Sequence, residues 1–243
     1  FDHFIFGDHK SLKKKINKNT AAIMIEPIMG EGGIKVIPDW CLKELRKLCD
    51  KKKILLIIDE VQTGIGLTGK FWAHEHFVKP DIIAFGKKAQ VCGILAGKRI
   101  DEVETNCFKV SSRINSTWGG NLVDMVRFQR ILEVIEQDKL VENAALLGKH
   151  LLEGLHQLSA KHAHFTNPRG QGLMCAIDLP NSHARDALVA ECMSQGLMIL
   201  GCGDQTIRFR PALTISMSEV DLALEILSSA YSTALDRCPV ATD

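Results

Sequence analysis

Polar side chains stand directly after apolar runs in the first half of the sequence. Glu26, Asp59 and the pair Lys87-Lys88 each follow a stretch with the composition of a buried strand. An acid at the end of such a strand is costly to bury unless a cation or a hydrogen-bond donor lies beside it. A lysine at a neighbouring strand end is a candidate nucleophile, because desolvation lowers the pKa of its amine toward neutrality.

An aspartate and a lysine in such positions are the pair that pyridoxal phosphate chemistry requires. The lysine forms a Schiff base with the cofactor, and the aspartate keeps the pyridine nitrogen protonated so that the ring accepts electrons. Asp59 and Lys87 are the candidates, with Lys88 as the alternative lysine. Aspartates and lysines also end many strands without doing chemistry, so the spacing by itself leaves a structural role open.

The cysteines form no disulfide or zinc pattern. No two are spaced as C-x-x-C, and most lie among apolar residues, where a thiol behaves as a small hydrophobic group. We therefore expect reduced, structural cysteines of a cytoplasmic protein. The eight positions are Cys41, Cys49, Cys92, Cys107, Cys175, Cys192, Cys202 and Cys238.

The histidines also argue against a metal centre. The pairs His74/His76 and His162/His164 have no cysteine or aspartate at ligand spacing. Zinc sites need such partners, so we expect these histidines to be solvated surface residues. No metal site is predicted.

The overall composition excludes several classes of protein. The chain has 243 residues, and 30 Lys and Arg against 29 Asp and Glu leave a net charge of +1, too little to favour nucleic acid or an acidic membrane. Apolar runs such as residues 54–58 are far shorter than the roughly 18 residues that span a bilayer. The length fits one large domain or two small ones. The chain begins at Phe1 without an initiator Met, so we expect a portion of a longer protein.

The first half of the sequence predicts alternating helices and strands. A Lys-rich helix is expected at residues 11–17, and a second helix is expected to begin at Pro38, with Asp39 as its N-cap. Alternation of this kind indicates a mostly parallel, layered α/β sheet, whose ligands bind outside the carboxyl ends of the strands. The expected strands are residues 21–26, 54–59, 81–86 and 94–98.

The second half predicts a smaller α+β domain. A long amphipathic helix after Asn121 is expected to join it to the first part, and the two domains are expected at residues 1–125 and 126–243. The expected helices are residues 121–137, 141–161, 184–195 and 218–234. The expected strands are residues 172–178, 198–200 and 206–210.

Five motifs, in order along the chain, carry a resemblance to a known enzyme family. They are Glu26-Pro-Ile-Met-Gly-Glu-Gly-Gly33, Asp59-Glu-Val-Gln-Thr-Gly64 followed by Pro80-Asp-Ile-Ile-Ala-Phe-Gly-Lys87, Asn115-Ser-Thr-Trp-Gly-Gly-Asn121, Pro168-Arg-Gly-Gln-Gly-Leu-Met174 and Ile207-Arg-Phe-Arg-Pro211. The chain resembles the fold-type I, class III aminotransferases over nearly its whole length. Residues 85–93 and 115–121 are most similar to the lysine ε-aminotransferase subgroup. The resemblance implies part of a large domain with a mostly parallel sheet, followed by a small α+β C-terminal domain.

The resemblance implies a role for each matching position in binding pyridoxal 5'-phosphate. Lys87 matches the Schiff-base lysine, and Asp59 matches the partner of the pyridinium nitrogen. Val61 is expected against the ring face, and Gln62 is expected to reach the phenolic oxygen. Thr117 resembles the threonine that contacts the phosphate from the other subunit, which implies a homodimer with a shared active site.

The resemblance further implies transfer of the ε-amino group of L-lysine to 2-oxoglutarate. Arg210 resembles the arginine that takes the substrate α-carboxylate, using its planar fork. Glu31 resembles a glutamate that pairs with this arginine when lysine is bound, and Asn115 is expected to line the same pocket.

Several alternatives stay open at this stage. Another ω-aminotransferase, acting on ornithine or 4-aminobutyrate, has similar motifs, and a non-catalytic fragment that packs on a partner chain is a further possibility. A nucleotide-binding α/β protein is less well supported, because no G-x-G-x-x-G follows a strand. Family members are longer, and their N-terminal part carries the phosphate-binding turn, an aromatic residue that stacks on the cofactor and further substrate contacts. None of these is expected in this chain.

Overall fold

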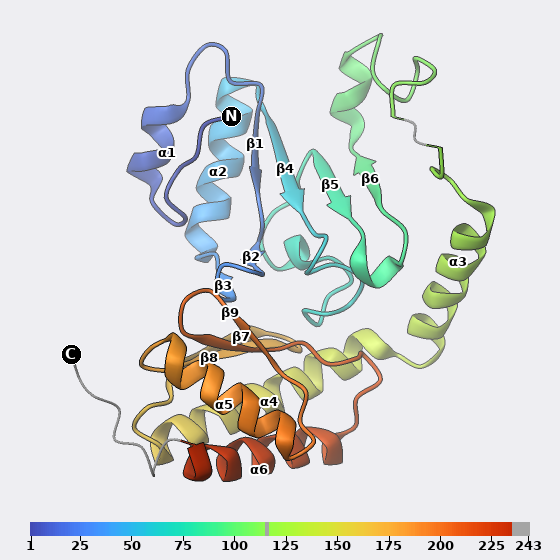
Figure 1. Cartoon of the computed structure of the whole chain (residues 1–243). Helices are drawn as coiled ribbons and strands as arrows, with labels where there is room; N and C mark the ends of the chain where they lie inside the picture. The colour runs from blue at the N-terminus through green and yellow to red at the C-terminus, as the bar shows by residue number, and fades with distance from the viewer. Residues whose placement is uncertain (115–116, 235–243) are drawn as a thin grey trace. The chain divides into compact units, whose positions relative to one another are not determined.

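The computed structural model describes residues 1–114 and 117–234, and it divides the chain into two compact units (Figure 1). Unit 1 comprises Phe1–Pro27, Ile37–Ile65 and Trp72–Asp138. Unit 2 comprises Ile28–Val36, Gly66–Phe71 and the chain from Lys139 onward. Two short segments of the first half therefore belong to unit 2. The family domains expected at residues 1–125 and 126–243 stay a prediction.

Unit 1 is built on a four-stranded sheet with the order β1-β4-β5-β6 (Figure 1). Its strands are β1 (Ala22–Ile25), β4 (Leu55–Asp59), β5 (Ile82–Phe85) and β6 (Gly93–Ala96). The pairs β1–β4 and β4–β5 are parallel, and β6 runs antiparallel to β5. The expectation of a mostly parallel α/β sheet is confirmed.

The described helices of unit 1 are α1 (His9–Lys15), α2 (Asp39–Lys52) and α3 (Leu122–Gln137). Helix α2 packs on β4 and buries an apolar stripe. Asp39 is not the N-cap of α2 as expected, because Pro38 occupies that position in an extended conformation. Asp39 instead lies in the first turn, where its negative charge is favourable beside the helix dipole.

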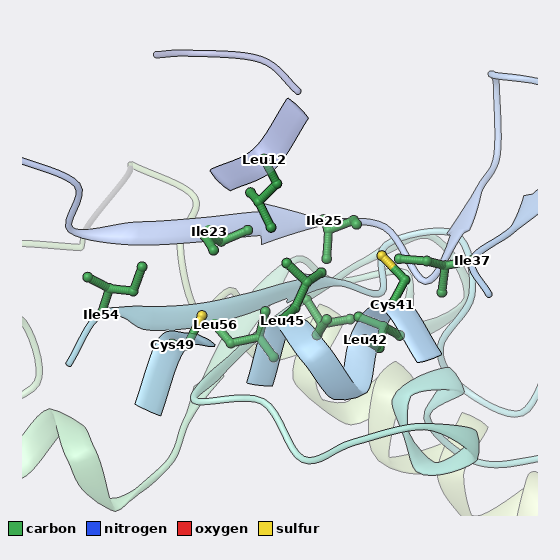
Figure 2. Packing of buried hydrophobic residues seen from close by; sticks show 11 residues of the cluster. Leu12, Ile23, Ile25, Ile37, Cys41, Leu42, Leu45, Cys49, Ile54 and Leu56 are labelled. Carbon is green, nitrogen blue, oxygen red and sulfur yellow. The ribbon is translucent and has the colours of Figure 1, made fainter. Parts of the chain in front are cut away.

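The core of unit 1 joins α1, α2, β1 and β4 (Figure 2). Leu42 and Leu45 of α2 are buried together with Leu56 of β4, and Leu12 of α1 reaches the same cluster. Burial of side chains of this size contributes roughly 1.5–3 kcal/mol each. This core fixes β1 and β4 side by side, and so fixes where both strands end.

Unit 2 contains an antiparallel sheet with the order β7-β8-β10-β9 and a separate two-stranded hairpin. The sheet strands are β7 (Thr166–Gln171), β8 (Met174–Asp178), β9 (Leu200–Cys202) and β10 (Thr206–Phe209). The hairpin pairs β2 (Ile28–Met29) with β3 (Lys35–Val36), and β3 packs beside β7.

Helices α4 (Leu140–Lys161), α5 (Ser182–Ser194) and α6 (Met217–Ala234) complete the described part of unit 2 (Figure 1). Helix α4 packs on β7 and β8, α5 packs on β9 and β10, and α6 contacts both helices. The expected helices and strands of this half are present, each within a few residues.

Strands β2, β3 and β7 were not predicted. Strand β7 contains Pro168, which cannot donate to a strand ladder, and its pairing register shifts between Thr166 and Arg169. Its sequence, Thr-Asn-Pro-Arg-Gly-Gln, has no apolar alternation. Only its pairing with the fully buried β8 makes this segment a strand.

Two histidines expected on the surface are packed against other side chains. His162 is 7% exposed, and its Nε2 lies 3.0 Å from Ser228 Oγ. The Nδ1 of His164 lies 3.0 Å from the hydroxyl of Tyr231, whose ring centroid is 4.2 Å from that of His162. The expectation of solvated side chains is wrong here, because the end of α4 meets α6 at this point.

The seven cysteines among the described residues are reduced. Burial raises the pKa of the Cys175 and Cys192 thiols to about 12, so both remain protonated at neutral pH. No group of histidine, cysteine and acidic side chains in the described ranges is arranged to hold a metal ion. None of the helices in these ranges has the length and apolar character needed to cross a membrane.

We predict that Gly148→Ala destabilises the protein. In an exposed helix this change stabilises by about 1 kcal/mol. In α4, however, a Cβ on Gly148 would overlap the carbonyl carbon of Gly172, which is backbone and cannot yield. The free energy of unfolding should fall by about 1–3 kcal/mol, measured by urea denaturation of the complete protein.

Gly154→Ala on the same helix is the matched control for this prediction. Its Cβ would meet Leu224 Cδ1, which is the end of a flexible side chain and can move aside. We expect a smaller loss of stability for this variant. A Gly148→Ala protein as stable as the wild type would contradict the close packing of α4 on the β7–β8 turn.

Candidate functional site

Asp59 and Lys87 lie at the carboxyl ends of adjacent parallel strands in unit 1. Asp59 is the last residue of β4 and stands opposite Ala84 of β5 in the pairing register. Gly86 follows β5 and leads into a short 3-10 turn, Lys87–Ala89. Since parallel strands end at the same edge of a sheet, the structure brings the predicted carboxylate and amine to one edge.

Val61 and Gly86 connect the two strand ends. The backbone N–H of Val61 donates to Asp59 Oδ1 at 2.9 Å, which holds the carboxylate in place. A Cβ on Gly86 would lie 3.7 Å from Val61 Cγ1 and 3.2 Å from Cys92 Sγ. The absence of a side chain at Gly86 therefore lets the lysine turn pass close to the loop that follows Asp59.

The two candidate lysines differ in environment. Lys87 is exposed and begins the 3-10 turn, whereas Lys88 is half-buried and makes its own contacts. Asp59 is half-buried at the neighbouring strand end. Pyridoxal phosphate needs a carboxylate for its pyridinium nitrogen and an amine that forms its Schiff base. An anchored carboxylate at one strand end and an exposed amine after the next strand supply both groups, so these residues fit pyridoxal phosphate.

The other predicted cofactor residues are distributed more widely. Gln62 is half-buried on the loop after β4, close in sequence to Val61, and Thr117 is exposed near the start of α3. Thr117 was expected to contact the phosphate in the other subunit, and this role stays a prediction. Asn115, predicted to line the substrate pocket, lies outside the described residues.

Glu60 is a buried carboxylate that sequence reasoning did not single out. Its side chain accepts hydrogen bonds from Thr63 Oγ1 at 2.7 Å, from Ala73 N at 2.9 Å and from His74 N at 2.7 Å. The Nδ1 of His74 lies 3.0 Å from the same carboxylate. Glu60 therefore fixes the loop that carries Val61 and Gln62. The available signal was an acid directly after Asp59, at the end of an apolar strand.

The contact with Glu60 also corrects the expectation that His74 is a solvated surface residue. The side chain of His74 is 12% exposed and is paired with Glu60, rather than solvated. The reason is tertiary: the 3-10 turn Ala73–His76 packs on the buried carboxylate. Nothing in the local sequence around His74 indicates this partner.

Glu31 and the two arginines of the Ile207-Arg-Phe-Arg-Pro211 motif lie together in unit 2. Glu31 stands in the loop between β2 and β3, and Arg208 is on β10. Arg208 Nη1 lies 2.7 Å from Glu31 Oε1, and the arginine side chain is only 12% exposed. Glu31 thus forms an ion pair with Arg208. The pairing expected between Glu31 and Arg210 stays a prediction.

Arg210 remains close enough to feel both charges. Partial removal from water lowers the pKa of Arg210, the positive charge of Arg208 lowers it further, and Glu31 opposes both effects. Residues two apart on a strand point to the same face of the sheet. Arg208 and Arg210 have this spacing. Because Arg208 lies within β10 and Arg210 beyond its end, only the first is held by pairing on both sides.

We predict that Glu60→Gln destabilises the protein by about 1–3 kcal/mol. The amide nitrogen that replaces one carboxylate oxygen would face an N–H or O–H donor in place of an acceptor, with no water to compensate. Thermal or urea unfolding of the complete protein measures the loss. Glu75→Gln is the matched control, because the exposed Glu75 accepts one backbone hydrogen bond at 2.9 Å and should change stability by less than about 0.5 kcal/mol. Equal effects at the two positions would contradict the anchoring role of Glu60.

Comparisons with known proteins identify the family of this chain. The family model described as aminotransferase class III matches residues 3–231. The L-lysine-epsilon aminotransferase of Mycobacterium tuberculosis is 51% identical over 212 residues, which is 86% of this chain and 47% of that protein. The mitochondrial 4-aminobutyrate aminotransferase of Sus scrofa is 36% identical over 219 residues, which is 88% of this chain and 43% of that protein.

A solved structure shows the same fold. The lysine aminotransferase from M. tuberculosis matches with a TM-score of 0.88 and 47% sequence identity, over 93% of this chain and 52% of that chain. The chain spans about half the length of the curated relatives it matches. The family expected from the sequence motifs is confirmed over almost the whole chain: the protein belongs to the class III aminotransferases.

Proposed function

We propose that the complete protein transfers the ε-amino group of L-lysine to 2-oxoglutarate, with pyridoxal 5'-phosphate as its cofactor. The products are L-glutamate and 2-aminoadipate 6-semialdehyde, which cyclises to a piperideine carboxylate. The observation that carries this proposal is the placement of Asp59 and Lys87 at one edge of the parallel sheet. The similarity to proteins named L-lysine-epsilon aminotransferase supports lysine as the amino donor.

The residues at the sheet edge divide the work. Pyridoxal phosphate, when bound, supplies an electron sink for the negative charge that develops as a substrate carbon loses its proton. Asp59 would place a negative charge at the pyridinium nitrogen. The backbone N–H of Val61 orients the Asp59 carboxylate by a hydrogen bond. Lys87 would hold the cofactor and, once displaced by substrate, its Nζ would move the proton as general acid and base. Val61 would cover the ring face, and Gln62 would reach the phenolic oxygen.

One active site must accept two unlike substrates. Lysine enters with its ε-amine toward the reacting centre. Its α-carboxylate is then at the far end of the aliphatic chain, away from that centre. 2-Oxoglutarate places its α-carboxylate there, and an arginine binds that group with paired hydrogen bonds. An arginine without an anion is costly in a pocket from which water is excluded. Glu31 would supply the anion while lysine reacts, and would release the arginine to 2-oxoglutarate.

The ion pair of Glu31 bears on which arginine is used. Arg210 was predicted from the motif, and Arg208, two residues earlier, lies 2.7 Å from Glu31. Because of this contact, we propose Arg208 as a carboxylate-binding group beside Arg210.

The proposal includes two further features of the complete protein. It is a homodimer whose Thr117 contacts the cofactor phosphate across the subunit interface, and it works in the cytoplasm. The reduced cysteines of the described residues support a reducing compartment.

We predict that borohydride reduction of the loaded protein attaches the pyridoxyl group to Lys87. Peptide mapping by mass spectrometry locates the modified residue. Lys87→Ala should abolish the attachment, whereas Lys88→Ala is the matched control and should retain it. Modification of Lys88, or of neither lysine, would overturn the assignment.

We predict opposite specificity changes for the arginine and glutamate variants. Arg208→Ala should lower kcat/KM for 2-oxoglutarate by about 10- to 150-fold, because it removes charge-assisted hydrogen bonds of about 1.5–3 kcal/mol. Arg210→Ala is the matched comparison, and a larger effect at Arg210 would restore the motif-based assignment.

Glu31→Gln should slow the lysine half-reaction and allow transamination of α-amino acids such as alanine. Single-turnover kinetics with lysine, ornithine, alanine and 2-oxoglutarate measure these changes.

A further inference from the structure

The loop that carries Glu31 has an unfavourable backbone. Gly33 has a φ of 101° and Ile34 a φ of 49°, so two successive residues adopt left-handed or related conformations. Glycine accepts such angles, but a β-branched residue adopts them only where its surroundings impose them. Ile34 is also completely buried. The loop therefore needs an anchor outside itself.

Arg169 of β7 provides that anchor. Its Nε donates to the carbonyl oxygens of Gly33 at 3.1 Å and Ile34 at 3.2 Å, the same two residues that hold the unfavourable angles. Its Nη2 also donates to Gly33 O. A guanidinium offers five N–H donors in a fixed planar fork, which suits several acceptors held in one plane.

Arg169 is itself held from the opposite side. Its Nη2 lies 2.8 Å from Asp178 Oδ1 and 3.1 Å from Thr206 Oγ1. Asp178 also accepts from Thr206 Oγ1 at 2.6 Å and from Asn167 Nδ2 at 3.0 Å. The Arg169 and Asp178 side chains are 16% and 12% exposed. A buried ion pair whose remaining polar atoms are bonded is costly to break on one side.

The charge on Asp178 persists at neutral pH. Burial by itself would raise the pKa of Asp178, but the hydrogen bonds from Arg169, Thr206 and Asn167 outweigh burial and hold it below its ordinary value. A carboxylate with a lowered pKa contributes its stabilisation above the ordinary pKa of aspartate and loses it only in acid. The anchor is therefore intact in the pH range in which the enzyme would work.

The strand register links this anchor to Arg208. Arg169 of β7 and Arg208 of β10 both stand opposite Ala176 of β8, one on each side. Residues directly opposite one another in antiparallel strands share a face, so the two arginines face the same side of the sheet with only a small side chain between them. Arg169 binds the loop backbone, and Arg208 binds the carboxylate of Glu31 in the same loop.

A third contact attaches the loop at Glu31 itself. The backbone N–H of Gly203 donates to Glu31 O at 2.9 Å. With the backbone held at Glu31, Gly33 and Ile34, the carboxylate is presented to Arg208 from a fixed starting point. The side chain alone can then rotate.

We propose that Arg169 is a positioning residue for amine-end selection: it holds the Glu31 loop in an unfavourable backbone conformation so that the Glu31 carboxylate stands at Arg208. The proposal rests on the proposed role of Glu31. Arg169 acts through Glu31 and touches no reacting group. Its loss leaves Arg208 in place on β10 but releases the loop to other conformations.

Arg169→Lys tests this proposal in the complete protein. Lysine keeps the positive charge beside Asp178 but lacks the planar fork. We expect the ratio of kcat/KM for lysine to kcat/KM for alanine to fall at least tenfold, with kcat/KM for 2-oxoglutarate changed less than threefold. Hydrogen exchange, measured without cofactor, should become at least tenfold faster in residues 30–36 and at the Gly203 amide.

Arg46→Lys is the matched control. Arg46 is 17% exposed and pairs with Asp81 at 2.9 Å in unit 1, so it matches Arg169 in burial and partner. Its replacement should leave both the substrate ratio and the exchange of residues 30–36 unchanged. If Arg46→Lys moves them as much as Arg169→Lys does, the effect is general destabilisation and the proposal is wrong.

Glu31→Gln separates failure of this proposal from failure of the proposed function. If Glu31→Gln lowers the ratio and Arg169→Lys does not, Glu31 keeps its role and the positioning proposal is overturned. If Glu31→Gln leaves the ratio unchanged, the role of Glu31 and the positioning proposal both fail. In the double variant, Arg169→Lys should add no further change, because it acts through Glu31. If Arg169→Lys does not fold, Thr206→Val replaces it in each of these measurements. That change removes the hydroxyl that bonds to both Arg169 and Asp178.

Discussion

Parallel pairing of β1, β4 and β5 is the constraint on which the rest of the structure depends. Parallel strands end at one edge of a sheet, and the chain leaves that edge at Glu26, Asp59 and Gly86. The polar groups follow the strands directly, so the buried core of β1, β4 and α2 also determines where Asp59 lies. The pairing of β5 with β4 then places Lys87 at the same edge. The cofactor chemistry proposed for this edge is thus a consequence of the packing beneath it.

Two segments that follow strands of this sheet belong to the second unit. After Pro27 the chain forms the β2–β3 hairpin, and after Ile65 it forms the segment Gly66–Phe71, and both belong to unit 2. Residues close in sequence to the cofactor candidates therefore contribute to the unit that holds Arg208. Glu31 is five residues after Glu26, yet its ion pair is with a residue far along the sequence. A contact of this kind joins the two halves of the sequence in one unit.

Buried charges hold the two loops that carry candidate site residues. Glu60 accepts hydrogen bonds from the loop after β4, and Arg169 with Asp178 holds the loop between β2 and β3. A buried charged group whose hydrogen bonds are all made fixes the direction of the backbone that it contacts. In both cases the anchor is not the residue expected to do chemistry. It is a neighbour that fixes the loop.

The sequence by itself determined the family, the parallel sheet and the positions of Asp59 and Lys87 at the ends of adjacent strands. Each depends on local signals: apolar runs, the residue that follows them, and ordered motifs. It assigned the substrate carboxylate to Arg210 and gave no role to Arg208, which the structure pairs with Glu31. Strand β7, the Glu60–His74 contact and the Arg169 anchor were also beyond it. Each depends on a partner distant in the sequence, and only the tertiary structure decides which distant groups meet. Desolvation restricts which contacts of this kind are stable. A buried carboxylate or guanidinium is stable only where the fold supplies its complete set of partners.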